Sequence, residues 1–122
     1  MISSRSKGMR YERHVASRFR EHGYNAFRGC QFQGGPDSPD VAGIPWIHPE
    51  CKAVERLNIQ EAFDQAKRDA GNKIPVVFHK RNNCEDLVTM RLDDWFELFR
   101  EYDASMVLAE RNEEDENIIS RL

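Results

Sequence analysis

Two carboxylates and an amine stand close together in one short stretch of the chain, where they could hold a metal ion beside a reacting group. The stretch PDVAGIPWIHPECK spans residues 39–52 and contains Asp40, Glu50 and Lys52. It predicts two short strands joined by a turn at 43–45, with Asp40 at the start of the first strand. Side chains alternate between the two faces of a strand, so Glu50 and Lys52 should share one face.

This arrangement suits a hard cation with oxygen ligands. The carboxylates of Asp40 and Glu50 and the backbone carbonyl of Cys51 could bind Mg²⁺, and the amine of Lys52 could lie beside a bound water. A Glu-x-Lys pattern on a strand is also common on solvated faces that have no catalytic role. The interpretation therefore depends on the elements around this stretch.

The segment 7–22 has helical periodicity, and an acid lies inside its apolar stripe. The stripe consists of Met9, Glu12, Val15, Ala16 and Phe19. An acid on an apolar helix face is costly to desolvate unless it is paired, hydrogen-bonded or near a metal. Glu12 therefore needs a partner. That partner could be the metal site or, in a purely structural role, an arginine or a backbone amide.

The remaining elements follow from apolar periodicity and from turn residues. They are a strand at 24–28, a glycine-rich loop at 29–38, a helix with Asn58 as its N-cap, strands at 75–80 and 86–91, and a last helix capped by Asp93 or Asp94. The last helix carries an aromatic stripe of Trp95, Leu98, Phe99 and Tyr102. We expect that stripe to lie in the core.

The charges are distributed unevenly along the chain. Its length of 122 residues allows one domain, which we place at 1–102, followed by an acidic tail at 103–122. The formal net charge is −3, but residues 1–35 carry seven basic side chains against two acids. Because salt screens charges beyond roughly 10 Å at 0.1 M, the local field matters more than the total. The basic N-terminal region is where we expect nucleic acid to bind.

Several classes of protein are not indicated by the composition. No apolar run has the length of a membrane span, and the N-terminus is polar, so we expect a soluble protein of the cytoplasm that does not bind membranes. The three cysteines, Cys30, Cys51 and Cys84, are odd in number and lack a CxxC spacing. Neither a disulfide framework nor a zinc site is therefore expected.

Several short motifs occur together in one order along the chain. They are Lys7-Gly8 and Glu12-Arg13 on the first helix, Pro39-Asp40-Val41, Glu50-Cys51-Lys52 and Gln65-Ala66. This set resembles the Holliday junction resolvase branch of the PD-(D/E)xK nuclease superfamily, which has phage-type and archaeal members, over about residues 5–102. The order of elements resembles the restriction-endonuclease-like fold, an α/β fold with a central mixed sheet flanked by helices.

The resemblance implies a metal-dependent endonuclease that hydrolyses phosphodiester bonds in branched DNA such as four-way junctions. Asp40 and Glu50 would be metal ligands, Lys52 would stabilise charge or orient water, Glu12 would be the helix carboxylate near the metal, and Gln65 would be a secondary active-site residue. The cofactor would be Mg²⁺, with Mn²⁺ as a substitute, and the location would be the bacterial host cytoplasm for a phage-encoded protein. The expected DNA contacts are Lys7, Arg10, Arg13 and Arg28.

The resemblance also implies a homodimer, because resolution needs paired cuts. Apolar surface for an interface could come from the last helix, with Trp95, Phe96 and Phe99, or from the tail, with Leu108, Ile118 and Ile119. Two other functions stay open: a catalytically silent nucleic-acid-binding module of the same fold, and a nuclease with nicking or end-trimming specificity.

Two residues depart from the family pattern or compete within it. Pro49 precedes Glu50 inside an expected strand and removes a hydrogen-bond donor, which predicts a bulge or an edge position. Asp37 is close enough in the chain to replace Asp40 as the metal ligand. Asp40 fits better because apolar strand residues follow it.

Overall fold

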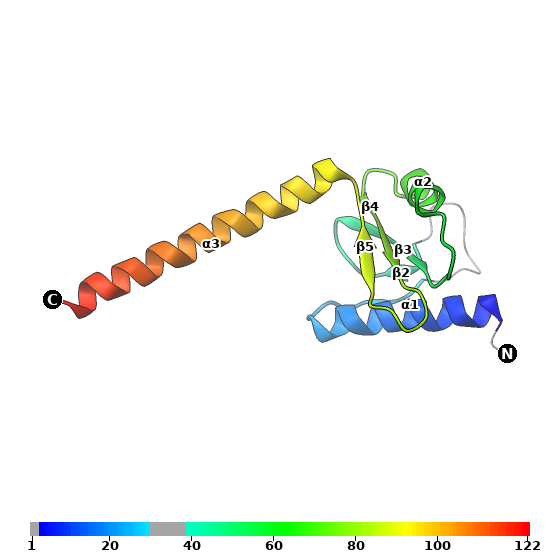
Figure 1. Ribbon diagram of the computed structural model, residues 1–122, viewed down its shortest axis with the longest axis horizontal. Helices are drawn as coiled ribbons and strands as arrows, with labels where there is room; N and C mark the ends of the chain where they lie inside the picture. The colour runs from blue at the N-terminus through cyan, green and yellow to red at the C-terminus, as the bar shows by residue number, and fades with distance from the viewer. Residues whose placement is uncertain (1–2, 30–38) are drawn as a thin grey trace. The chain divides into compact units, whose positions relative to one another are not determined.

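The computed structural model describes residues 3–29 and 39–122. These fall into two compact units, Met1–Met90 and Arg91–Leu122, which are described separately. The elements in chain order are α1 (Ser4–Glu21), β1 (Phe27–Arg28), β2 (Val41–Ala42), β3 (Ile47–Lys52), α2 (Ile59–Asp69), β4 (Ile74–His79), β5 (Leu87–Thr89) and α3 (Leu92–Ser120) (Figure 1). The competing ligand Asp37 and most of the predicted loop lie outside the described residues.

The two helices of the first unit begin where side chains cap them. The side chain of Ser3 accepts a hydrogen bond from the backbone N–H of Ser6, so α1 starts earlier than its apolar stripe. The side chain of Asn58 accepts from the N–H of Glu61 at 3.1 Å, which confirms the predicted cap of α2. Gly23, with φ of 92°, follows the end of α1.

A mixed three-stranded sheet has the order β3-β4-β5. Strand β3 runs parallel to β4, and β4 pairs antiparallel with β5, which confirms that the strands expected at 75–80 and 86–91 are partners. Helices α1 and α2 pack on opposite faces of it: Cys51 and Phe78 belong to the cluster under α1, whereas the next residue toward the N-terminus of β4, Val77, packs with Ala62 and Ala66 of α2. This is the predicted α/β architecture.

Strand β2 does not join β3 in a ladder, although the sequence suggested that the two form adjacent strands across a turn. Among the described residues, β2 pairs antiparallel with β1 in a separate two-stranded sheet. A single backbone hydrogen bond, from the N–H of Asp40 to the carbonyl of Pro49 at 3.1 Å, joins the approach to β2 with β3. Strand β3 is thus an end strand of its sheet, which agrees with the edge position expected for Pro49.

Two glycines allow the backbone around β2 to pack closely. A Cβ on Gly29 would lie 1.9 Å from the carbonyl oxygen of Pro39, and a Cβ on Gly43 would lie 2.3 Å from that of Asn25. Gly43 also has φ of 86°, a conformation that L side chains rarely adopt. The N–H of Gly29 donates to the carbonyl of Asp40 at 2.8 Å. These contacts fix the backbone on both sides of Asp40.

The second unit is the helix α3, which runs without a break through residues 102 and 103, where a domain and a tail were expected to meet. Arg91 occupies the N-cap position with no side-chain hydrogen bond, so the predicted caps Asp93 and Asp94 lie instead in the first turn. No residue of α3 is buried. The prediction that its aromatic stripe lies in the core was therefore wrong for the single chain. None of the helices in the described part is both long and apolar enough to cross a bilayer.

Candidate active site

All five predicted catalytic residues line one cleft of about 740 Å³. They are Glu12 on α1, Asp40 before β2, Glu50 and Lys52 on β3, and Gln65 on α2. The cleft therefore combines groups that lie more than fifty residues apart in the chain. Lys7 and Arg28, two of the four predicted DNA contacts, also line it.

Asp40 is held against β3 by its side chain as well as by its backbone. One carboxylate oxygen accepts a hydrogen bond from the backbone N–H of Cys51 at 2.8 Å, in a buried position. Because β3 is an end strand, this N–H has no ladder partner on that side within the described sheet, and Asp40 satisfies it. The carboxylate is thereby placed beside the middle of β3, near Glu50.

Glu50 is almost fully buried, and its surroundings oppose its negative charge. Burial raises the pKa of Glu50, and the nearby carboxylate of Asp40 raises it further, to about 8, although the amine of Lys52 acts in the opposite direction. A divalent cation between the two acids would favour both carboxylates in their charged form. Carboxylate and carbonyl oxygens are the donors that Mg²⁺ takes, so Asp40, Glu50 and the Cys51 carbonyl fit that ion chemically.

The amine of Lys52 lies between a neutral partner and an acid. It donates to the side-chain oxygen of Gln65 at 3.2 Å and lies 3.8 Å from a carboxylate oxygen of Glu50. Its side chain is about one quarter exposed, so the amine reaches the cleft while its stem packs against protein. Gln65 therefore anchors the amine from α2.

Glu12 has the partner that its burial requires. The Nε–H of Arg28 donates to a carboxylate oxygen of Glu12 at 2.6 Å, and the carboxylate is largely buried. The arginine is one of the partners that the sequence suggested, and the acid also lines the cleft. Arg28 thus lies inside the cleft as an ion pair and not on an open surface.

A family model described as archaeal Holliday junction resolvase (hjc) matches residues 3–94. The chain belongs to the archaeal Holliday junction resolvase family. No curated protein and no solved structure matches the chain significantly. The resemblance seen in the sequence is confirmed, and with it the α/β, restriction-endonuclease-like fold and a place among the resolvase-like endonucleases.

The resolvase family match extends over α1, all described strands and α2, and it ends in the first turn of α3. Every residue lining the cleft therefore lies within the matched range. Most of α3 lies beyond it. Of the predicted DNA contacts, Arg10 and Arg13 are exposed on α1 and do not line this cleft.

A second group of possible ligands in this chain shares Glu50. The ligand atoms of His48, Glu50 and Asp69 all lie within 4.8 Å of one another. Sequence reasoning assigned His48 no metal-binding role, although its spacing of two residues from Glu50 on a strand places both on one face. An imidazole together with carboxylates favours transition metals such as Mn²⁺ over Mg²⁺.

Proposed function

We propose that this resolvase-family chain is a divalent-metal-dependent endonuclease that cuts four-way DNA junctions as a homodimer. The observation that supports it best is the convergence of Asp40, Glu50 and Lys52 in one cleft with the Glu12–Arg28 pair. An acid cluster on a surface that meets phosphates has no use in binding alone, because like charges repel. The cluster therefore favours catalysis over a silent binding module.

The carboxylates of Asp40 and Glu50, with the carbonyl of Cys51, would hold the metal. When bound, Mg²⁺ or Mn²⁺ lowers the pKa of a coordinated water and offsets charge on the scissile phosphate. Glu50 is buried and its charged form is disfavoured. Binding of the metal is therefore expected to release a proton from this carboxyl at neutral pH.

Lys52 would stabilise negative charge that develops on the phosphate. Its amine is held by Gln65 at 3.2 Å and so needs little reorganisation when the substrate arrives. A preorganised group of this kind contributes about 3 kcal/mol to transition-state stabilisation. Gln65 is then a positioning residue that acts through Lys52.

Arg28 would meet a phosphate from the other side of the cleft. Its Nε–H is used by Glu12, which leaves the two terminal nitrogens of the guanidinium as donors. Glu12 orients this guanidinium and offsets its charge. Lys7, which also lines the cleft, supplies a second cation at its edge.

The homodimer proposal rests on the pattern of apolar residues in α3. Residues spaced alternately by three and four form one seam: Leu92, Trp95, Phe99, Tyr102, Met106 and Ala109. The rings of Trp95 and Phe99 already stack, with centroids 5.2 Å apart. Three such heptads are typical of helices that pair with another helix. A second copy of α3 would cover this seam.

The charges of α3 favour an antiparallel pair. The same spacing continues to Glu113 and Glu116. In a parallel pair in register, each of these acids would face its own copy, whereas an antiparallel pair places them beyond the apolar part of the partner's seam. Like charges in a seam destabilise the pairing.

Incubation with labelled four-way junction, duplex and single-stranded DNA, each with Mg²⁺ or with EDTA, tests the proposal. We expect metal-dependent, paired nicks in the junction and little cleavage of the other two substrates. Junction binding without cleavage in any divalent metal would support the silent module. Single nicks on every substrate would support a nuclease of different specificity.

A further inference from the structure

A second groove adjoins the active-site cleft and is built from two distant parts of the chain. One wall is α1, with Lys7, Arg10 and His14, and the other is the turn after β4, with Lys80 and Arg81. Asn82 and Asn83 complete this turn. The sequence predicted only that Lys80 ends a strand and that Arg81 to Asn83 connect it to the next one, because nothing local shows that these residues face α1.

The groove and the cleft are continuous. Lys7 and Ala53 line both of them. The backbone N–H of Lys80 donates to the carbonyl of Lys52 at 3.0 Å. Lys80, which directly follows β4, therefore lies beside Lys52 at the end of β3. Paired strands are about 4.8 Å apart. A phosphate backbone that leaves the cleft past Lys52 therefore enters the groove directly.

The turn that carries Arg81 is fixed by its backbone. The N–H of Cys84 donates to the carbonyl of Arg81 at 3.1 Å, and Asn83 adopts φ of 60°, a conformation that asparagine tolerates. The N–H of Asn82 donates to the carboxylate of Glu55 at 2.7 Å. That carboxylate also lies 3.8 Å from the amine of Lys7, so it joins the turn to α1.

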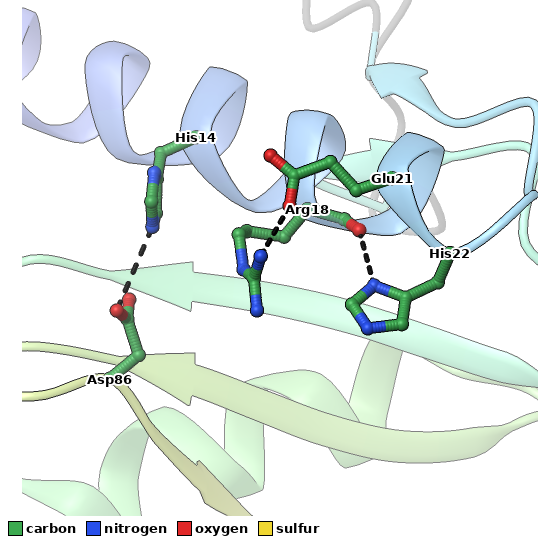
Figure 2. Close-up of polar contacts among 5 residues, drawn as sticks. All are labelled: His14, Arg18, Glu21, His22 and Asp86. Carbon is green, nitrogen blue, oxygen red and sulfur yellow. Dashed lines mark hydrogen bonds and ion pairs between the residues drawn. The ribbon is translucent and has the colours of Figure 1, made fainter.

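The charge of the groove is positive. Lys7, Arg10, Lys80 and Arg81 contribute four cations, and Glu55 is the acid that faces them from the adjoining loop. Asp86 is a second acid at one end of the groove, where it lies 3.6 Å from a ring nitrogen of His14 (Figure 2), so the four cations outnumber the two acids. Figure 2 also shows Arg18 paired with Glu21, and the ring of His22 bonded to the Arg18 carbonyl, so these groups farther along α1 are engaged with one another.

We propose that this groove, here called the turn groove (Lys7, Arg10, His14 and Lys80 to Asn83), binds the phosphodiester backbone of the DNA strand next to the cut. The inference rests on the proposed function, since the strand is the one held in the active site. Lysine, arginine and asparagine side chains are common phosphate ligands and read no base sequence. The turn groove would position the junction without contributing sequence specificity.

The test compares two neutralised pairs of neighbouring cations. Lys80→Ala with Arg81→Ala removes the turn cations but keeps the Lys80 N–H that bonds Lys52. The matched control, Lys67→Ala with Arg68→Ala, removes two exposed cations from the last turn of α2, away from the turn groove. Junction affinity is measured in EDTA at several salt concentrations, and thermal unfolding verifies that each variant is folded.

We expect the turn variant to bind the junction at least about tenfold more weakly than wild type. Each lost phosphate contact lowers the slope of log affinity against log salt by about 0.9, so the slope should fall by about 2. The control should change neither by a comparable amount. The charge-conserving pair Lys80→Arg with Arg81→Lys should retain most of the affinity.

Single-turnover cleavage separates this inference from the proposed function. At saturating protein, the turn variant should cut the junction in Mg²⁺ at nearly the wild-type rate, because the cleft is intact. Equal weakening in both neutralised variants, or no change in the turn variant, would overturn the inference. Wild-type protein that binds the junction and never cuts it would contradict the endonuclease proposal, while the salt slopes would still decide the role of the turn groove.

Discussion

At the scale of single residues, the cleft is built around two carboxylates whose negative charges repel each other. One carboxylate oxygen of Asp40 accepts a hydrogen bond from the backbone N–H of Cys51, and Glu50 is buried beside it with a raised pKa. Under the proposed function, the proton on Glu50 and a divalent cation would compete for the same carboxyl. That competition would determine how stability and metal binding respond to pH.

Metal-free protein should lose stability as pH rises. The pKa of Glu50 is raised from 4.5 to about 8 in the folded protein, so between these values the folded state binds more protons than the unfolded state. The free energy of unfolding then falls with increasing pH over that window. Urea unfolding in EDTA between about pH 5 and pH 8 measures this. Saturating Mg²⁺ should remove most of the dependence.

Replacing Glu50 by glutamine should separate stability from catalysis. Glu50→Gln is neutral at every pH, so in EDTA at pH 8 it should be more stable than wild type and show a flatter pH dependence. It should also lose metal-dependent cleavage, because a ligand carboxylate is gone. Thermal unfolding and the junction assay are the measurements. A variant that cuts like wild type would show that Glu50 is not in the active site.

Lys52 and Gln65 should differ in how severely their loss affects cleavage. Lys52→Ala removes the charge itself and should lower the rate at saturating protein by about a hundredfold or more. Gln65→Ala removes only the oxygen that holds the amine, so we expect a smaller loss, of about tenfold. Single-turnover rates on the junction compare them. A larger loss for Gln65 would give it a direct role with the substrate.

At the scale of elements, the close approach of β1 and β2 places Asp40. Gly43→Ala should lower the free energy of unfolding by about 2 kcal/mol, because Gly43 has a positive φ and a Cβ would meet the Asn25 carbonyl. Gly8→Ala is the control: it lies inside α1 with open space around it, and it should stabilise the protein by about 0.5 to 1 kcal/mol. Urea unfolding measures the free energy of unfolding of both variants. Equal changes in the two variants would contradict the prediction.

The elements also show how far sequence reasoning could go. Local signals sufficed for the cap of α2 and for the alternation that puts Glu50 and Lys52 on one face, but not for the start of α1, which Ser3 caps before the expected first residue. The choice of Asp40 over Asp37 stays a prediction. Local signals could not show that Arg28 pairs with Glu12 or that Lys80 lies beside Lys52. Those contacts join parts of the chain whose proximity is decided by the sheet order and not by neighbouring residues.

Helix α3 illustrates a different limit. Its stripe of Trp95, Phe99 and Tyr102 was assigned to the core because apolar residues spaced by three and four mark a buried helix face in either case. The spacing is the same whether the covering surface belongs to the same chain or to another one. Only the finding that no residue of α3 is buried in the single chain separates these two possibilities.

At the scale of the whole molecule, the seam of α3 predicts a dimer. Phe99→Lys should shift the protein from dimer to monomer at micromolar concentration, because it buries a charge in an apolar seam. Isolated helices are marginal without packing, so the variant should also lose helical content. Ala104→Lys, which lies outside the seam, should leave a dimer. Light scattering and circular dichroism compare the two variants. A Phe99→Lys variant that stays dimeric would contradict the assignment of the seam as the dimer interface.

The hydrogen bond from Cys51 to Asp40 gives this chain a built-in spectroscopic reporter. The backbone amide of Cys51 donates to the same carboxylate that would hold the metal, at 2.8 Å. Any ligand that draws electron density from that carboxylate weakens its hold on the amide proton. The NMR chemical shifts of the Cys51 amide nitrogen and proton should therefore change on titration with Mg²⁺, which is diamagnetic. Metal occupancy of the candidate site could then be followed at this one amide, without DNA and without a cleavage reaction.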